Sequence, residues 1–152
     1  MDISKKLQEL GLTLPEPIRP VGSYVPAITS ENLLYLSGIL PFKKGKLLYT
    51  GRVGGAVSVQ QAQEASKLTV LNALAIIKES IGLERIKQCI RMNGYIASEE
   101  NFYDQPAVLN AASDLLKTLF GDAGVHTRTA IGVYALPLNS PVEIDFIFEI
   151  KG

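Results

Sequence analysis

Apolar and polar residues alternate along this chain with two different periods, which predict helices and strands. Two segments, 58–82 and 105–120, repeat apolar residues every three or four positions, the spacing of a helix that buries one face. A shorter repeat of the same kind covers residues 3–10. Five further segments alternate apolar with polar residues or are rich in β-branched and aromatic ones, as strands are: 24–29, 33–37, 86–97, 126–134 and 142–150.

Boundary signals support the two long helices. Ser58, with Gln61 three residues later, has the pattern of a capping box, in which each side chain bonds a free amide at the helix start. Pro106 fits the first turn of the second helix, where no intrahelical donor is lost. Gly82 and Gly121 predict the two helix ends.

The order of these elements predicts an α+β fold, with two long helices packed on one face of a mixed β-sheet. The length favours a single domain, 1–152, in which residues 1–20 form a leading helix and an extended, proline-rich connector. The glycine- and lysine-rich residues 41–55 predict loops around a short strand. No predicted helix remains for the second face of the sheet, so we expect another copy of the chain to cover it.

Composition and charge argue against several classes of function. The 15 basic and 15 acidic residues cancel and form no basic block, so nucleic-acid binding is not expected. One histidine and one cysteine cannot supply a typical zinc site, and Cys89 lies in an apolar strand as a core residue would. The N-terminus lacks the apolar segment of a signal peptide, and no apolar run approaches the roughly 18 residues of a membrane span. We therefore expect a soluble cytoplasmic protein.

The two C-terminal strands carry the most informative charged residues. The turn-forming residues 136–141 between them predict a β-hairpin. Arg128 shares its strand face with Ala130 and Gly132, whose small size leaves space for a carboxylate beside the guanidinium. An ion pair with Glu149, the expected cross-strand partner, would explain Arg128 equally well.

Glu143, on the last strand, has two interpretations. Its carboxylate is either part of a solvated face or a group that activates or positions a water molecule. If Ala135 pairs with Val142 in the hairpin, Glu143 lies roughly 20 Å from Arg128. The two side chains could then share a small substrate only across a subunit interface.

Several short motifs resemble those of the Rid/YjgF family. The C-terminal pattern Arg-x-x-x-x-Val-x-x-Leu-Pro at 128–137, followed by Val-Glu-Ile-Asp at 142–145, is similar to the family's C-terminal signature. Tyr24 stands where the family has a tyrosine at its first strand, residues 37–41 resemble its SGQ-x-P turn, and Asn110 resembles the asparagine of its VNATY motif. The resemblance spans about residues 20–150.

The resemblance implies a chorismate-mutase-like sandwich that assembles as a homotrimer with clefts between subunits. Family members of the deaminase type hydrolyse 2-aminoacrylate and related enamines or imines to 2-keto acids and ammonia, without a metal or organic cofactor. Arg128 would hold the substrate carboxylate, and Glu143 of the neighbouring subunit would orient or activate the attacking water. Further ligand contacts would come from these residues: Tyr24, Ser37, Gly38, Asn110, His126 and Ala130.

The chain also departs from the deaminase pattern at three positions. Ala130 replaces a cysteine that is frequent in the deaminases, and Ile39 replaces the glutamine of the SGQ motif. His126, two residues before the arginine, is similar to a separate branch of the family, and either a ligand contact or a structural role would suit it.

Three functions are consistent with these observations. The first is deamination of small enamines or imines, and the second is binding or sensing of a small carboxylate in the same cleft without turnover. The third is the RNA cleavage or translation inhibition attributed to some relatives. The neutral charge and the single histidine argue against the third function.

Overall fold

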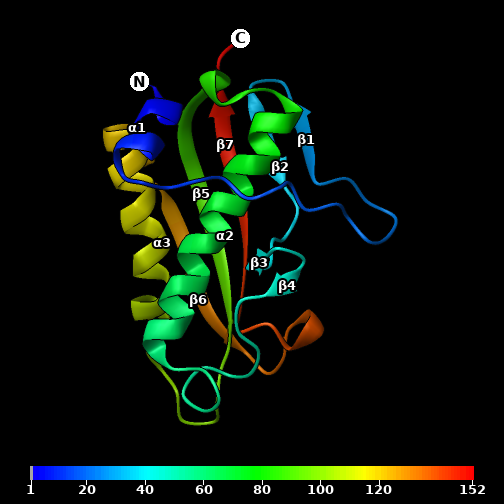
Figure 1. Ribbon diagram of the computed structural model, residues 1–152, viewed down its shortest axis with the longest axis vertical. Helices are drawn as coiled ribbons and strands as arrows, with labels where there is room; N and C mark the ends of the chain where they lie inside the picture. The colour runs from blue at the N-terminus through cyan, green and yellow to red at the C-terminus, as the bar shows by residue number, and fades with distance from the viewer. Residues whose placement is uncertain (1) are drawn as a thin grey trace.

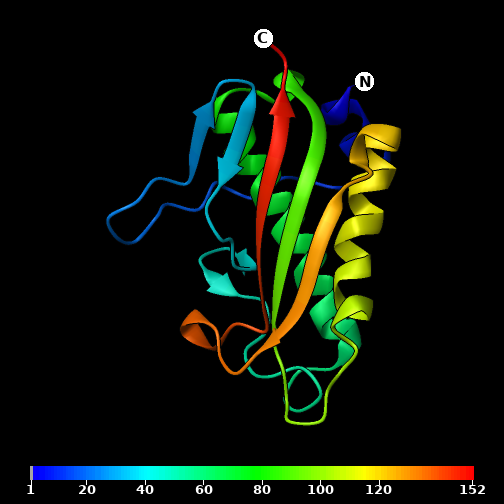
Figure 2. The same ribbon diagram turned by 180° about the vertical axis from the view of Figure 1, so that it is seen from behind.

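The fold is built on a five-stranded mixed β-sheet (Figures 1 and 2), which confirms the predicted α+β class. The computed structural model describes residues 2–152. The strands lie in the order β1-β2-β7-β5-β6. Their bounds are Ala27–Ser30 for β1, Leu33–Leu36 for β2, Ile86–Ala97 for β5, Thr127–Val133 for β6 and Val142–Ile150 for β7. A separate short ribbon is formed by β3 (Phe42–Lys43) and β4 (Lys46–Leu47).

β5 lies between β6 and β7, so the predicted C-terminal hairpin is wrong. Met92 of β5 opposes Arg128 of β6 in a parallel pair and Phe146 of β7 in an antiparallel pair. The connection 134–141 contains a short 3₁₀ helix, η3 (Pro137–Asn139), and passes the end of β5 to reach β7 (Figure 2). The two C-terminal strands are thus both neighbours of β5 and not of each other.

Helices α2 (Val59–Ser80) and α3 (Gln105–Phe120) pack on one face of the sheet, as predicted (Figure 1). The capping box of α2 is present, with Ser58 Oγ accepting from the Gln61 amide at 3.1 Å and Gln61 Oε1 accepting from the Ser58 amide at 3.0 Å. The short helix α1 (Ile3–Glu9) packs against α3. Two 3₁₀ turns complete this layer, η1 (Leu83–Arg85) and η2 (Gly121–Gly124).

The core lies between these helices and one face of the sheet. Every second residue of β7 is buried there: Val142, Ile144, Phe146, Phe148 and Ile150. On β5 a bulge between Cys89 and Arg91 interrupts the alternation, so that Cys89 is buried and Ile90 is half-buried. Burial raises the pKa of the Cys89 thiol to about 12, which keeps it protonated and unreactive. Cys89 is therefore a core residue, as predicted.

A proline-rich segment, residues 13–26, crosses the outer side of α2 before β1 begins (Figure 1). We call this segment the strap. Arg19 on the strap forms a two-pronged ion pair with Glu79 of α2, with nitrogen–oxygen distances of 2.8 and 3.1 Å. Because β1 starts at Ala27, Tyr24 belongs to the strap and does not start the first strand.

The other face of the sheet carries no helix in the part of the chain that the structure describes (Figure 2). Exposed apolar side chains on this open face come from the edge strands: Ile28 on β1 and Ile131 on β6. Tyr35 on β2 adds a further partly exposed ring. Within residues 2–152, no helix has the length and apolar character needed to cross a membrane.

Candidate functional site

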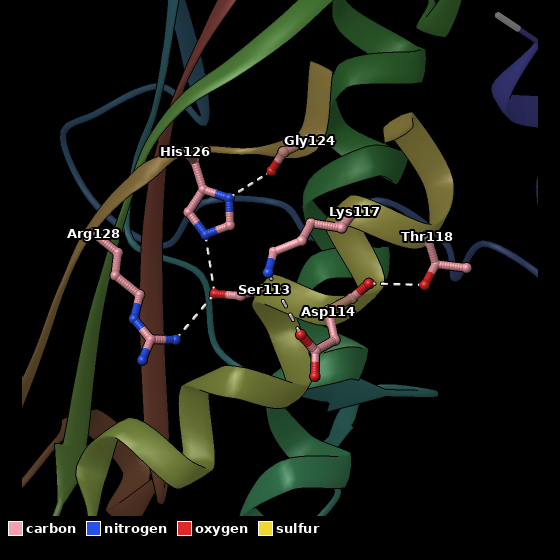
Figure 3. Close-up of polar contacts among 7 residues, drawn as sticks. All are labelled: Ser113, Asp114, Lys117, Thr118, Gly124, His126 and Arg128. Carbon is pink, nitrogen blue, oxygen red and sulfur yellow. Dashed lines mark hydrogen bonds and ion pairs between the residues drawn. The ribbon is translucent and has the colours of Figure 1, made fainter. Parts of the chain in front are cut away.

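Arg128 projects from the edge strand β6 toward the helices. Its strand partner Met92 is fully buried on the helix side, and its own Nη1 donates a hydrogen bond of 3.0 Å to Ser113 Oγ on α3 (Figure 3). The ion pair with Glu149 that we considered does not form. Glu149 instead accepts from Lys87 at 2.9 Å, which is the leading cause of the lowered pKa of that carboxyl.

His126 fixes the direction of the hydrogen bonds that reach Arg128. The His126 Nδ1 atom lies 2.6 Å from the carbonyl oxygen of Gly124, so in the neutral ring Nδ1 carries the hydrogen and donates it. Nε2 is then an acceptor, and the Ser113 hydroxyl, at 2.9 Å, donates to it (Figure 3). The serine oxygen is left to accept from Arg128. The resulting chain of donors runs from Arg128 through Ser113 and His126 to the Gly124 carbonyl.

Asp114, the acidic neighbour of Ser113, takes no part in this chain. Its carboxylate pairs with Lys117 at 3.9 Å, and its carbonyl accepts from Thr118 Oγ1 at 2.8 Å (Figure 3). Among residues 2–152, no carboxylate forms an ion pair with Arg128. The remaining guanidinium N–H groups are therefore available to an anionic ligand.

Glu143, on β7, lies on the open face of the sheet beside Gly38. A β-carbon at position 38 would meet the Glu143 carboxylate, so the glycine allows that flexible side chain to lie directly against the backbone. Half-burial, followed by the nearby charge of Asp145, raises the pKa of the Glu143 carboxyl. Asp145 itself accepts from Asn93 at 2.8 Å and from Tyr95 at 3.1 Å. Within the described chain no hydrogen bond or ion pair reaches Glu143, so its carboxylate is free to act on a ligand.

Tyr24, Ser37 and Gly38 lie together, on the wall of a cavity of about 390 Å³ at the end of β2. The Ser37 hydroxyl donates to the carbonyl of Val25 at 2.7 Å, so its hydrogen is committed to the strap. The amides of Ser37 and Ile39 have backbone acceptors, whereas the Gly38 amide has none among residues 2–152. Gly38 thus offers a free donor next to the Glu143 carboxylate.

The two groups of candidate residues do not meet in one chain. The arginine group (Arg128, Ser113 and His126) is on the helix side, whereas the glutamate group (Glu143 and Gly38 with their neighbours) is on the open side. Three residues along the strands and two strand spacings separate the backbones of Arg128 and Glu143 by roughly 14 Å. This replaces the 20 Å expected from the hairpin. The two side chains are kept apart because they lie on opposite faces of the sheet, and not because they are far apart along a hairpin.

The predicted contact residues Asn110 and Ala130 differ in their position relative to the arginine and glutamate groups. Asn110 is exposed on the outer side of α3 and lines a groove with Leu10 of the segment after α1. Ala130 follows Arg128 on the same face of β6, opposite Gly94 of β5. Within one chain, Ala130 accompanies the arginine group, and Asn110 joins neither group.

Sequence reasoning missed Ser113, the residue that holds Arg128. It lies on the apolar face of α3, four residues after Leu109 and three before Leu116, and only 6% of it is exposed. A hydroxyl at a core position of a helix needs a partner. The sequence signal is therefore a polar residue in an apolar stripe, which indicates a buried hydrogen bond but does not name its partners.

Residues 4–150 match the family model described as "YjgF/chorismate_mutase-like, putative endoribonuclease". The chain belongs to the YjgF/Rid family. The predicted fold and resemblance are thereby confirmed. Among solved structures, the protein Atu1372 of unknown function from Agrobacterium tumefaciens is 45% identical to this YjgF/Rid chain, with a TM-score of 0.89 over 97% of this chain and 91% of that one.

Two YjgF/Rid relatives differ in what their names say. Protein TCP17 of Trypanosoma cruzi is 33% identical over 98% of this chain and 94% of its own length, and its name states no activity. The 2-iminobutanoate/2-iminopropanoate deaminase of Dermatophagoides farinae is 28% identical over 92% of this chain and 95% of its own length. Both matches span nearly the whole of this chain and of the relative.

Proposed function

We propose that this protein hydrolyses small enamines or imines of 2-amino acids to 2-keto acids and ammonia, in clefts between the subunits of a homotrimer. Arg128 of one subunit binds the substrate carboxylate. Glu143 of the neighbouring subunit orients the attacking water, beside the Gly38 amide. No metal or organic cofactor takes part in this proposal.

The observation that carries the proposal is that each of the two groups lacks the charged partner that the other could supply. Arg128 has a fixed guanidinium without a carboxylate, and Glu143 has a half-buried carboxylate without a cation. They lie on opposite faces of one sheet. A second copy could bring one group to the other, and the exposed apolar residues of the open face, such as Ile28 and Ile131, give that copy a surface to bury.

The chemistry requires little beyond positioning. Water adds to the carbon of the C=N bond, and the tetrahedral amino alcohol then loses ammonia, so one water is consumed and one ammonia released. In the addition, the Glu143 carboxylate accepts a proton from the water and passes it to the imine nitrogen. In the collapse, it accepts the hydroxyl proton of the amino alcohol and passes it to the departing nitrogen. A carboxyl group with a raised pKa suits both transfers, because its two protonation states lie closer in free energy at neutral pH. The 28% identical deaminase supports this assignment.

A coupled assay tests the proposed activity directly. A pyridoxal-phosphate enzyme generates the imine in the cuvette, and keto acid and ammonia are followed with and without this protein. We expect release well above the rate in buffer. A rate equal to that in buffer, with saturable binding of a keto acid retained, would indicate a carboxylate-binding protein without turnover.

Sedimentation at working concentration should give a trimer. A monomer would contradict the proposed cleft between subunits.

Glu143→Gln should stabilise the chain when Arg128 is absent. Burial raises the folded pKa of Glu143 above its ordinary value, so the folded chain loses stability as pH rises from that value through the folded pKa. In an Arg128→Ala background, Glu143→Gln should raise Tm at pH 7.5 by about 1–3 °C and have no such effect at pH 4. With Arg128 present the gain should shrink, because the neighbour's guanidinium stabilises the carboxylate. Equal gains in both backgrounds would show that the two side chains do not interact.

A further inference from the structure

The cavity beside Gly38 is larger than a three-carbon imine requires. Its volume of about 390 Å³ falls in the range of pockets that enclose whole organic ligands. It lies where the strap, the segment 37–42 and the η3 connection come together, and Ile76 of α2 forms part of its wall. The cavity is therefore continuous with the proposed site at Gly38 but extends away from it.

The wall of this cavity is mainly apolar. Its apolar lining includes Ile18 and Val21 of the strap, Leu40, Phe42 and Leu138. The polar groups on the wall include the free Gly38 amide, the Tyr24 side chain and the Arg19 guanidinium, which is already paired with Glu79. The Glu143 carboxylate lies beside Gly38, next to this wall. A ligand that places its reacting carbon and nitrogen near Gly38 and Glu143 would extend any apolar substituent into the cavity.

Two features hold the walls of the cavity in place. The ion pair between Arg19 and Glu79 attaches the strap to α2 with both guanidinium nitrogens engaged. Leu138, which also lines the cavity, has a φ of 58°, a left-handed conformation that is unfavourable for leucine. The next residue, Asn139, is also left-handed, and its carbonyl accepts from the Gly51 amide at 2.8 Å. The fold thus holds a strained leucine at the cavity mouth, where 68% of it remains exposed.

We infer that this cavity is the side-chain subsite of the cleft, and that the substrates are 2-imino acids with a branched aliphatic or aromatic side chain. The inference rests on the proposed function for the position of the carboxylate and the reacting carbon. Apolar contacts in the cavity favour each added methylene, whereas 2-aminoacrylate would leave the cavity unfilled. Leu138 and the strap are then the specificity-determining parts of the chain.

Binding of the product keto acids tests the subsite without requiring turnover. Pyruvate, 4-methyl-2-oxopentanoate and phenylpyruvate are titrated into the full-length protein by calorimetry. We expect the two larger acids to bind at least about tenfold more tightly than pyruvate. Leu138→Trp, which fills the mouth, should abolish that preference and leave pyruvate affinity within about twofold. Leu10→Trp, at an exposed leucine that ends α1 and does not line the cavity, is the matched control and should retain the preference.

The possible outcomes separate this inference from the proposed activity. Equal affinities for all three acids, or a preference that survives Leu138→Trp, would overturn the subsite. Faster deamination of the three-carbon imine than of the larger ones would also overturn it, with the deaminase function intact. Graded binding that is sensitive to Leu138→Trp, with no ammonia released from any imine, would support the subsite and refute the deaminase. The thermal midpoint of each variant shows that it is folded.

Discussion

Chains carrying Arg128→Ala and chains carrying Glu143→Gln, each inactive alone, are expected to regain activity when they assemble together. Either change should lower kcat/KM by about 10²–10³-fold, because each removes one side of the site. In a randomly mixed trimer, a cleft can combine the intact Glu143 of one chain with the intact Arg128 of the other. About one quarter of the clefts should be complete in an equal mixture, so activity should return to about a quarter of wild type.

Two controls make the complementation test specific. Arg128→Ala chains mixed with chains that carry both changes should stay inactive, because no intact Glu143 can meet an intact Arg128. Glu149→Gln changes a carboxylate on the same strand and the same face, but one that is bound by Lys87, and it should keep activity. If mass spectrometry shows mixed trimers and no activity returns, the two residues do not share a cleft between subunits.

Gly94→Ala should be strongly destabilising. Gly94 lies in the middle of β5, opposite Ala130 of β6 and Ile144 of β7, on the face that packs against α3. A β-carbon there would overlap the side chain of Leu109, which is itself fully buried and cannot move aside freely. We expect a loss of about 2–3 kcal/mol and a fall in Tm of about 5–10 °C, measured by thermal and urea denaturation.

A double mutant and a second glycine test the cause of that loss. Combined with Leu109→Ala, which frees the space, Gly94→Ala should cost less than it does alone. Gly132→Ala is the matched change on β6, where the new methyl meets the end groups of Gln105 and Ser98, two half-buried side chains with more room to shift than Leu109. It should cost less than about 1 kcal/mol. Equal losses at both glycines would mean that crowding by Leu109 is not the reason.

The elements of this fold were predictable because their signals are local. The capping pair Ser58 and Gln61 and the stop at Gly82 determine α2, and the alternation of apolar and polar residues over 86–97 determines β5. The insertion of β5 between the last two strands was not predictable, because consecutive strands usually pair and the turn-rich connection 136–141 suited a hairpin. The sequence of that connection does not indicate that β5, some 40 residues earlier in the chain, lies between β6 and β7.

For the candidate site, too, the sequence indicates which residues to consider but not which distant segments lie beside them. Arg128 and Glu143 could be proposed as candidates from their own strands, since Arg128 shares a face with small residues and Glu143 alternates with large apolar ones. Their separation onto two faces depends on the register with β5, which the sequence does not state. Ser113 was missed for a related reason, because a serine in a helix is common and gains meaning only when His126 and Arg128 are placed beside it.

The hydrogen-bond chain from Arg128 to Gly124 also bears on affinity. A free arginine side chain has about 2 kcal/mol of rotamer entropy, part of which a ligand must ordinarily remove when it binds. Here Ser113 and His126 have already restricted the guanidinium before any ligand arrives. The restriction is part of the cost of folding and not of binding. A small carboxylate, which can make few contacts of its own, would gain most from that arrangement.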